Sequence, residues 1–153
     1  MLHELSRVDE GATIGEGTKV WANTHICKGA KIGKDCTIGE NVYIGNNVVI
    51  GDRCRIQNGA LIYEGVTMGN DVFIAPGVVT TNDIFPELPV GDWKHRFKET
   101  LIEDNVSVGA NSTIICGIRL GKGCMVGAGS VVTKSVSSNV VVVGNPAKHL
   151  RWK

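Results

Sequence analysis

Leucine, aromatic residues and long apolar runs are all scarce in this sequence of 153 residues. Leucine occurs 7 times, whereas valine and isoleucine together occur 34 times, and aromatic residues make up 5% of the chain. Because β-branched residues favour strands, this balance argues against a helix bundle and indicates an all-β fold. No apolar run approaches the roughly 20 residues that a membrane-spanning helix needs, so we expect no membrane partner.

An excess of charge of one sign is also missing. The 16 Lys and Arg residues nearly balance the 15 Asp and Glu residues, which leaves a formal net charge of +1. A dedicated nucleic-acid-binding protein usually carries a basic excess, so we expect no nucleic-acid partner. The first ten residues lack the apolar core of a signal peptide, and the cysteine count of five is odd. We therefore expect one soluble, cytoplasmic domain with free thiols over residues 1–153.

A six-residue repeat runs through most of the chain. Stepping by six from Val8 to Thr80 meets an aliphatic residue at 12 of 13 positions, and the register resumes from Ile102 to Val132. Three residues after the aliphatic position stands Gly, Asn or Asp in 17 of 18 units, with Arg53 as the exception. These three residue types best tolerate positive φ, which predicts a sharp corner. Each unit is therefore predicted to be a short strand followed by a corner.

Such a short unit cannot bury its apolar face alone, so the units must stack around a shared core. The pattern resembles the hexapeptide-repeat family, in which three units form each coil of a left-handed parallel β-helix. The resemblance implies this all-β fold, with coils over 8–85 and 102–143, an extruded loop at 86–101 and a short tail at 144–153. It also implies a homotrimer with active sites between neighbouring subunits.

Cysteine and histidine show no familiar zinc-binding spacing. We expect three cysteines to be buried structural thiols because they occupy the small, inward position of the unit: Cys36, Cys54 and Cys124. Cys27 and Cys116 fall near corners and form no CxxC motif. Gamma-class carbonic anhydrases of this fold hold zinc with three histidines from neighbouring coils, whereas here only His25 lies within a coil. The sequence therefore predicts no metal and a structural role for His25.

Polar residues are predicted to gather at the corner where the inserted loop departs. Residues at matching positions of consecutive coils lie above one another, which places Asn82 directly above Glu64. A different corner carries Gln57 and becomes small and smooth in the later coils, at Ala110 and Ala128. The resemblance to the hexapeptide-repeat family implies acyl transfer from coenzyme A, its commonest activity. A polar pocket would then lie beside a groove of exposed peptide groups suited to the pantetheine arm.

Five segments resemble a narrower group, the nucleotide-linked 3-amino-sugar N-acetyltransferases that serve surface polysaccharide synthesis: Trp21–Ile26, Arg55–Asn58, Ile62–Gly65, Thr81–Asp83 and Gly144–Lys148. Members act on UDP-2-acetamido-3-amino-2,3-dideoxyglucuronate or on dTDP-3-amino-3,6-dideoxyhexoses. The resemblance implies an acetyl-CoA-dependent N-acetyltransferase that needs no metal. Many related aminosugar enzymes carry His-Glu or His-Asp where this chain has Tyr63-Glu64, and a phenol with a pKa of about 10 is no ready base. The amine would then enter in its neutral form.

The resemblance and the stacking together assign hypothetical roles. Asn82 and Asp83 would be catalytic because they would position the amine of the sugar. The remaining assignments are substrate binding by Gln57, Tyr63 and Glu64, pantetheine binding by the backbone of Ala110 and Ala128, and phosphate binding by Lys134 and Lys148.

Two alternatives stay open at this point. A sugar O-acetyltransferase would be expected to need a histidine to activate a hydroxyl group. A non-catalytic β-helix scaffold would need neither the loop at 86–101 nor the Thr81–Asp83 cluster. Thiol release from acetyl-CoA in the presence of sugar nucleotides separates these alternatives.

Overall fold

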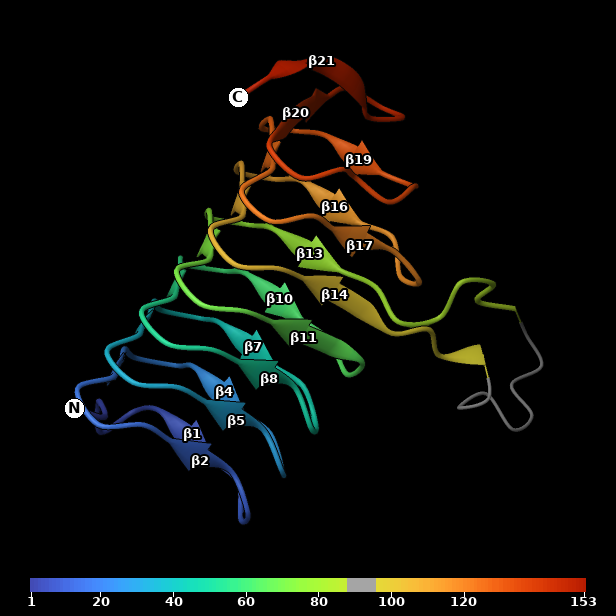
Figure 1. Ribbon diagram of the computed structural model, residues 1–153. Coiled ribbons are helices and arrows are strands. Elements are labelled where there is room, and N and C mark those ends of the chain that lie inside the picture. Colours follow the sequence, from blue (N-terminus) through green and yellow to red (C-terminus); the bar gives the residue numbers. More distant parts are fainter. Residues whose placement is uncertain (88–95) are drawn as a thin grey trace.

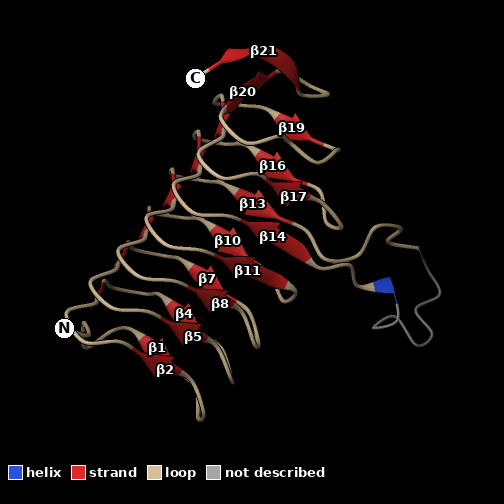
Figure 2. Ribbon diagram, in the orientation of Figure 1, coloured by secondary structure: helices blue, strands red, loops and turns tan. Residues whose placement is uncertain are grey.

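The computed structural model describes residues 1–87 and 96–153, and it shows a left-handed β-helix of about seven turns. The predicted all-β fold is confirmed, and short strands stack in three parallel sheets along one axis (Figure 1, Figure 2). The first sheet contains β1 (Arg7–Val8), β4 (His25–Ile26), β7 (Tyr43–Ile44), β10 (Leu61–Ile62), β13 (Val79–Thr80), β16 (Thr113–Ile114) and β19 (Val131–Val132).

The other two sheets form the remaining sides of the helix. The second contains β2 (Thr13–Ile14), β5 (Lys31–Ile32), β8 (Val49–Ile50), β11 (Val66–Met68), β14 (Thr100–Ile102) and β17 (Arg119–Leu120). The third contains β3 (Lys19–Val20), β6 (Thr37–Ile38), β9 (Arg55–Ile56), β12 (Phe73–Ile74), β15 (Ser107–Val108), β18 (Met125–Val126), β20 (Val140–Val143) and β21 (Lys148–Trp152).

The core is a set of aliphatic columns inside the helix. From Val20 onward, the repeated aliphatic side chains of the described coils are at most 4% exposed. Cys36, Cys54 and Cys124 lie among them, at most 1% exposed, as predicted for structural thiols. Burial raises the pKa of the Cys124 thiol to about 11, which keeps this group protonated and unreactive near neutral pH.

The corners adopt the left-handed backbone conformation that the repeat predicts. All corner residues from Gly11 to Gly77 and from Asn105 to Gly129 have φ between 54° and 97°. Arg53 has this conformation too, at φ 57°, although its residue type does not favour it. Its guanidinium forms two hydrogen bonds of 2.8 Å with Asp71 in the next coil, so the side chain pairs along the stack.

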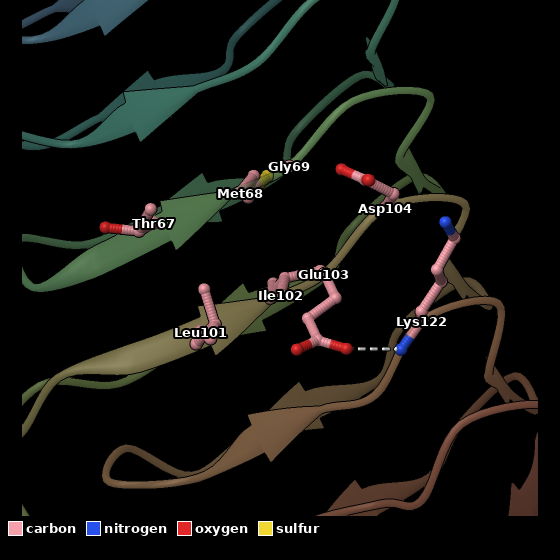
Figure 3. Close-up of a pocket in the computed structure, with 8 residues that line it drawn as sticks. All are labelled: Thr67, Met68, Gly69, Leu101, Ile102, Glu103, Asp104 and Lys122. Atoms are coloured by element: carbon pink, nitrogen blue, oxygen red, sulfur yellow. Dashed lines mark hydrogen bonds between the residues drawn. The ribbon is translucent and has the colours of Figure 1, made fainter.

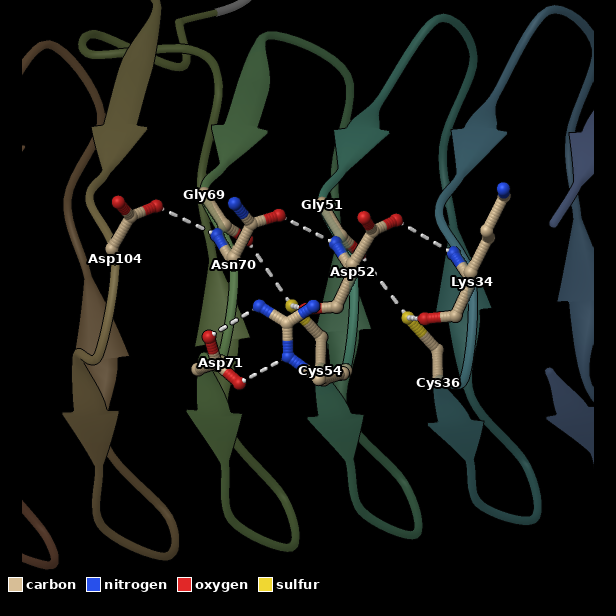
Figure 4. A network of polar contacts seen from close by, with 10 residues as sticks. Lys34, Cys36, Gly51, Asp52, Cys54, Gly69, Asn70, Asp71 and Asp104 are labelled. Carbon is tan, nitrogen blue, oxygen red and sulfur yellow. Dashed lines mark hydrogen bonds and ion pairs between the residues drawn. The ribbon is translucent and has the colours of Figure 1, made fainter. Parts of the chain in front are cut away.

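A ladder of side-chain hydrogen bonds runs along the same corner (Figure 4). The backbone N–H groups of Lys34, Asp52 and Asn70 each donate to the side chain in the next coil, at 2.7–2.8 Å; the acceptors are Asp52, Asn70 and Asp104. Glycine is required beside this ladder because the coils approach closely. A Cβ atom at Gly51 would lie 2.5 Å from the Asn70 side-chain oxygen and 2.5 Å from the Gly69 carbonyl oxygen.

The repeat is interrupted after β13, where the chain leaves the coil. Half of the predicted loop, residues 88–95, lies outside the described residues. On its return, Phe97 pairs with Asp83 in an antiparallel bridge, and β14 then joins β11 in register. The segment expected to be a tail contains β21, which pairs antiparallel with β20 at the end of the third sheet. Within the described residues, no helix is long and apolar enough to cross a membrane.

The glycine ladder yields a first prediction. Gly51→Ala should destabilise the protein by about 2–3 kcal/mol, because the new methyl group would collide with backbone of the next coil. Gly59→Ala is the matched control, since a Cβ there meets nothing within 4 Å and only the left-handed φ of +70° costs about 1 kcal/mol. Thermal unfolding followed by circular dichroism measures both. Equal losses for the two variants would contradict the close-approach argument.

Candidate functional site

A cavity of about 310 Å³ lies where the chain leaves the β-helix. Its described lining comprises Tyr43, Asn46, Tyr63, Glu64, Asn82, Asp83 and Phe97. Tyr63, Glu64, Asn82 and Asp83, four of the predicted site residues, therefore lie around one space. The stacking argument placed Asn46 in the column of Glu64 without giving it a role, and it did not identify Tyr43 or Phe97. Asn46 stands one coil below Glu64 in the same column, whereas Tyr43 lies in the neighbouring column, paired with Leu61, and Phe97 depends on the path of the loop.

Thr80 fixes the position of Tyr63. In the lower coils, the equivalent N–H groups of Cys27 and Gly45 donate to the backbone carbonyls of Ile44 and Ile62. The N–H of Tyr63 instead donates to the Thr80 hydroxyl, at 2.9 Å. This replacement explains why the aliphatic column contains a threonine at this level.

An aromatic ladder extends downward from Tyr63. The ring centroids of Tyr63 and Tyr43 are 5.3 Å apart, and the imidazole of His25 meets Tyr43 edge-on at 5.9 Å. A hydrogen bond to Cys27 and partial burial together raise the pKa of Tyr43 to about 12. Tyr43 therefore stays protonated at neutral pH and can act as a hydrogen-bond donor.

Asp83 is held by the returning end of the loop. One carboxylate oxygen lies 3.0 Å from the Arg96 guanidinium, and the other accepts the N–H of Phe85 at 3.0 Å. The Arg96 guanidinium also donates to the Phe85 carbonyl, at 2.9 Å, while Lys98 N–H donates to the Asn82 carbonyl, at 3.0 Å. Because Arg96 offsets the charge of Asp83, this carboxylate is better suited to orienting a ligand than to removing a proton.

The other predicted residues lie outside this cavity in a single chain. Gln57 lines a different cavity of about 270 Å³, beside Trp21 and Glu40. Ala110 is partly buried against the core, and Ala128 is exposed. The coils approach closely at this corner, because a Cβ at the neighbouring Gly109 would lie 2.5 Å from the Ala128 nitrogen.

Both predicted phosphate-binding lysines are exposed. Lys134 follows β19, and Lys148 begins β21. Neither belongs to the described lining of the cavity that contains Asn82 and Asp83. Within one chain, the described residues therefore separate the predicted substrate pocket from the predicted coenzyme A surface.

A somewhat larger cavity, of about 370 Å³, lies on the second sheet beside β11 and β14 (Figure 3). Its charged residue Glu103 accepts hydrogen bonds of 2.7 Å from Arg119 and from the backbone of Lys122. The hydrogen bond from Arg119 is the main cause of the lowered pKa of Glu103. Because these hydrogen bonds already occupy the Glu103 carboxylate, this cavity is a weaker candidate for an active site.

A further cluster was missed by the sequence argument. Asp9 Oδ2 lies 2.9 Å from His25 Nε2, and the Cys27 sulfur lies 3.7 Å from the same nitrogen. The signal was available, because Asp9 occupies the position one coil below Cys27 and His25 is two residues from that cysteine. The hydrogen bond to His25 is the main cause of the lowered pKa of Asp9.

Comparison with known proteins places these features in a family. Residues 20–95 match the model of the GMPPB C-terminal domain, and residues 100–134 match that of the hexapeptide repeat of succinyl-transferase. The fold and the matched repeats together define a left-handed β-helix protein built from hexapeptides. The chain belongs to the hexapeptide-repeat family.

Two curated relatives match about half of the chain. A 2,3,4,5-tetrahydropyridine-2,6-dicarboxylate N-acetyltransferase of Staphylococcus aureus is 38% identical over 85 residues, which cover 56% of this chain and 32% of the relative. A galactoside O-acetyltransferase of Lactococcus lactis is 37% identical over 84 residues, which cover 53% of this chain and 40% of the relative. The matched region thus spans well under half the length of these relatives.

Solved structures match nearly the whole chain. The acetyltransferase domain of PglB from Neisseria gonorrhoeae, in complex with acetyl coenzyme A, has a TM-score of 0.66 at 21% identity, covering 97% of this chain and 56% of that one. A point mutant of AntD, an N-acyltransferase from Bacillus cereus, was solved with dTDP-4-amino-4,6-dideoxyglucose and coenzyme A. Its TM-score is 0.63 at 20% identity, covering 97% of this chain and 84% of that one. At these identities the likeness shows the fold.

The Thr80 hydroxyl gives a second prediction. Thr80→Val keeps the shape but leaves the Tyr63 N–H without its acceptor, so the free energy of unfolding should fall by about 1–3 kcal/mol. Thr100→Val is the matched control, because the hydroxyl of Thr100 is equally buried but has no hydrogen-bond partner among the described residues. Denaturant titration should show Thr100→Val to be neutral or stabilising. Similar losses in both variants would refute the role of Thr80.

Proposed function

We propose that this protein is an acetyl-CoA-dependent N-acetyltransferase that acts on the amino group of a nucleotide-linked amino sugar. The observation that carries the proposal is the polar cavity formed by Tyr63, Glu64, Asn82 and Asp83 where the loop departs. The similar folds of AntD, bound to a dTDP-amino sugar and coenzyme A, and of PglB, bound to acetyl coenzyme A, support it. The product would serve surface polysaccharide synthesis in the cytoplasm, a setting that suits five free thiols.

The proposed reaction needs positioning more than it needs a strong base. The neutral amine attacks the carbonyl carbon of the thioester, and the tetrahedral intermediate expels the thiolate of coenzyme A as the C–S bond breaks. The proton lost by the nitrogen ends on the departing sulfur, directly or through water. Asn82 would hold the amine, and Asp83, kept in place by Arg96, would orient it against the thioester.

A second subunit would complete the site. Gln57, Ala110 and Ala128 lie on another corner of the same prism. We propose a homotrimer in which that corner of one copy faces the Asn82 cavity of its neighbour, because a three-fold arrangement brings unlike corners together. The smooth corner would then hold pantetheine, with Lys134 and Lys148 near the phosphates of coenzyme A.

O-acetylation of a sugar is the second candidate, because the galactoside O-acetyltransferase is among the relatives. A hydroxyl must lose a proton to become a good nucleophile, and histidine is the side chain that most often removes it. None of the described residues that line the cavity is a histidine. The amine acceptor is therefore favoured over the hydroxyl acceptor.

The acceptor assay is the third prediction. Purified protein should release free thiol from acetyl-CoA when UDP- or dTDP-linked amino sugars are added, and mass spectrometry should find one acetyl group on nitrogen. Matching sugar nucleotides that carry a hydroxyl in place of the amine should give background rates. Turnover of the hydroxyl sugars alone would favour O-acetylation, whereas no thiol release with either set would favour a scaffold.

The fourth prediction concerns the cavity residues. Asn82→Ala and Asp83→Asn should each lower kcat/KM by roughly 100-fold, because misplacing a reactant by about 1 Å can cost that much. Asp71→Asn is a matched control: Asp71 also pairs with an arginine, Arg53, but on another corner. It should keep near-normal kcat/KM. Near-normal rates for both cavity variants, in folded protein, would show that the site lies elsewhere.

A further inference from the structure

The cluster of Asp9, His25 and Cys27 combines three kinds of metal ligand from two coils. Asp9 follows β1, His25 lies in β4, and Cys27 follows β4 directly. Coil stacking brings Asp9 beneath Cys27, 18 residues further along, and within reach of His25, 16 residues further along. One potential ligand atom from each side chain can be chosen so that all three lie within 4.8 Å of one another.

The spacing of the three ligand atoms comes close to that around a tetrahedral zinc ion. Zinc bonds of about 2.0–2.3 Å in tetrahedral geometry put neighbouring ligand atoms roughly 3.3–3.7 Å apart. The distance from His25 Nε2 to the Cys27 sulfur is 3.7 Å, and that from His25 Nε2 to Asp9 Oδ2 is 2.9 Å. The carboxylate and imidazole would have to move apart by about 0.5 Å to take an ion between them, and the third pair, Asp9 and Cys27, has ligand atoms within 4.8 Å.

The cluster is open to solvent on one side and supported on the other. The side chains of His25 and Asp9 are 31% and 24% exposed, whereas Cys27 is 4% exposed. Arg7 donates to the other carboxylate oxygen of Asp9, at 2.9 Å, which leaves Oδ2 directed at His25. The edge-on ring of Tyr43 fixes the imidazole. Such supporting contacts orient metal ligands in known sites.

We propose that Asp9 Oδ2, His25 Nε2 and Cys27 Sγ bind a soft divalent cation of the zinc type, with a fourth position open to water. Thiolate, imidazole and carboxylate together suit Zn²⁺, while Mg²⁺ and Ca²⁺ prefer oxygen ligands alone. On binding, the Cys27 thiol releases its proton to solvent. The three ligands lie outside the described lining of the Asn82 cavity, although Tyr43, which lines that cavity, contacts His25 and Cys27.

Cobalt(II) titration of the intact protein tests this proposal, because Co²⁺ occupies zinc sites and a thiolate ligand gives it a charge-transfer absorption band. One Co²⁺ per chain should bind with this band, and Zn²⁺ should displace it. Cys27→Ser should remove the band. His25→Gln and Asp9→Asn should each weaken Co²⁺ binding by more than about 100-fold, because even changes to residues that only support metal ligands can cost that much. Cys116→Ser, at another buried free thiol, should bind as the wild type does.

Circular dichroism establishes that each variant is folded, and Zn²⁺ should raise the thermal midpoint of the wild type and of Cys116→Ser but not of Cys27→Ser. The proposal is overturned if the wild type shows no thiolate band with Co²⁺, or if Cys27→Ser binds Co²⁺ as tightly as the wild type. Either result would mean that the three side chains form a hydrogen-bonded cluster that does not bind a metal ion.

Discussion

The parallel hydrogen bonding of each coil to the next is the constraint on which the rest of the structure depends. Because the coils are held in register, a residue's neighbours are set by its position in the repeat, and equivalent side chains form columns. The aliphatic columns supply the core, and the left-handed corners keep each turn tight. The same register turns separated sequence positions into neighbours at the surface, which is how both the cavity and the Asp9 cluster arise.

The regular coils and the candidate site occupy different parts of the chain. Where the register is unbroken, polar groups stabilise the corners, as in the ladder from Lys34 through Asp52 to Asn70. Where the chain leaves the coil, a hydroxyl replaces a backbone acceptor at Thr80, and Arg96 returns to pair with Asp83. The candidate site is thus built at the level where the repeat is interrupted and its regular hydrogen bonding changes.

Much of this could be predicted from spacing, because one physical rule repeats in every coil. The strands, the buried cysteines and the grouping of Glu64 with Asn82 all follow from position in the repeat. Spacing could not predict that Arg96 would meet Asp83, since their contact depends on the path of the loop. It also placed Gln57 on a different corner without saying what faces that corner, because such a contact belongs to an assembly.

The Asp9 cluster shows another limit of reading motifs along the sequence. Metal sites are sought as short local spacings, such as CxxC, and none exists here. In a β-helix, the relevant distance is one coil, so Asp9 and Cys27 are neighbours despite their separation. Searching for ligands by column would find this arrangement in any protein of the same architecture.

A crystal structure of the protein with coenzyme A and a UDP- or dTDP-linked amino sugar tests the central claim most directly. The account predicts the sugar amine within hydrogen-bond distance of Asn82, with pantetheine along Ala110 and Ala128 of a neighbouring copy. A sugar bound away from Asn82 and Asp83, or both ligands held within one chain at another corner, would contradict it.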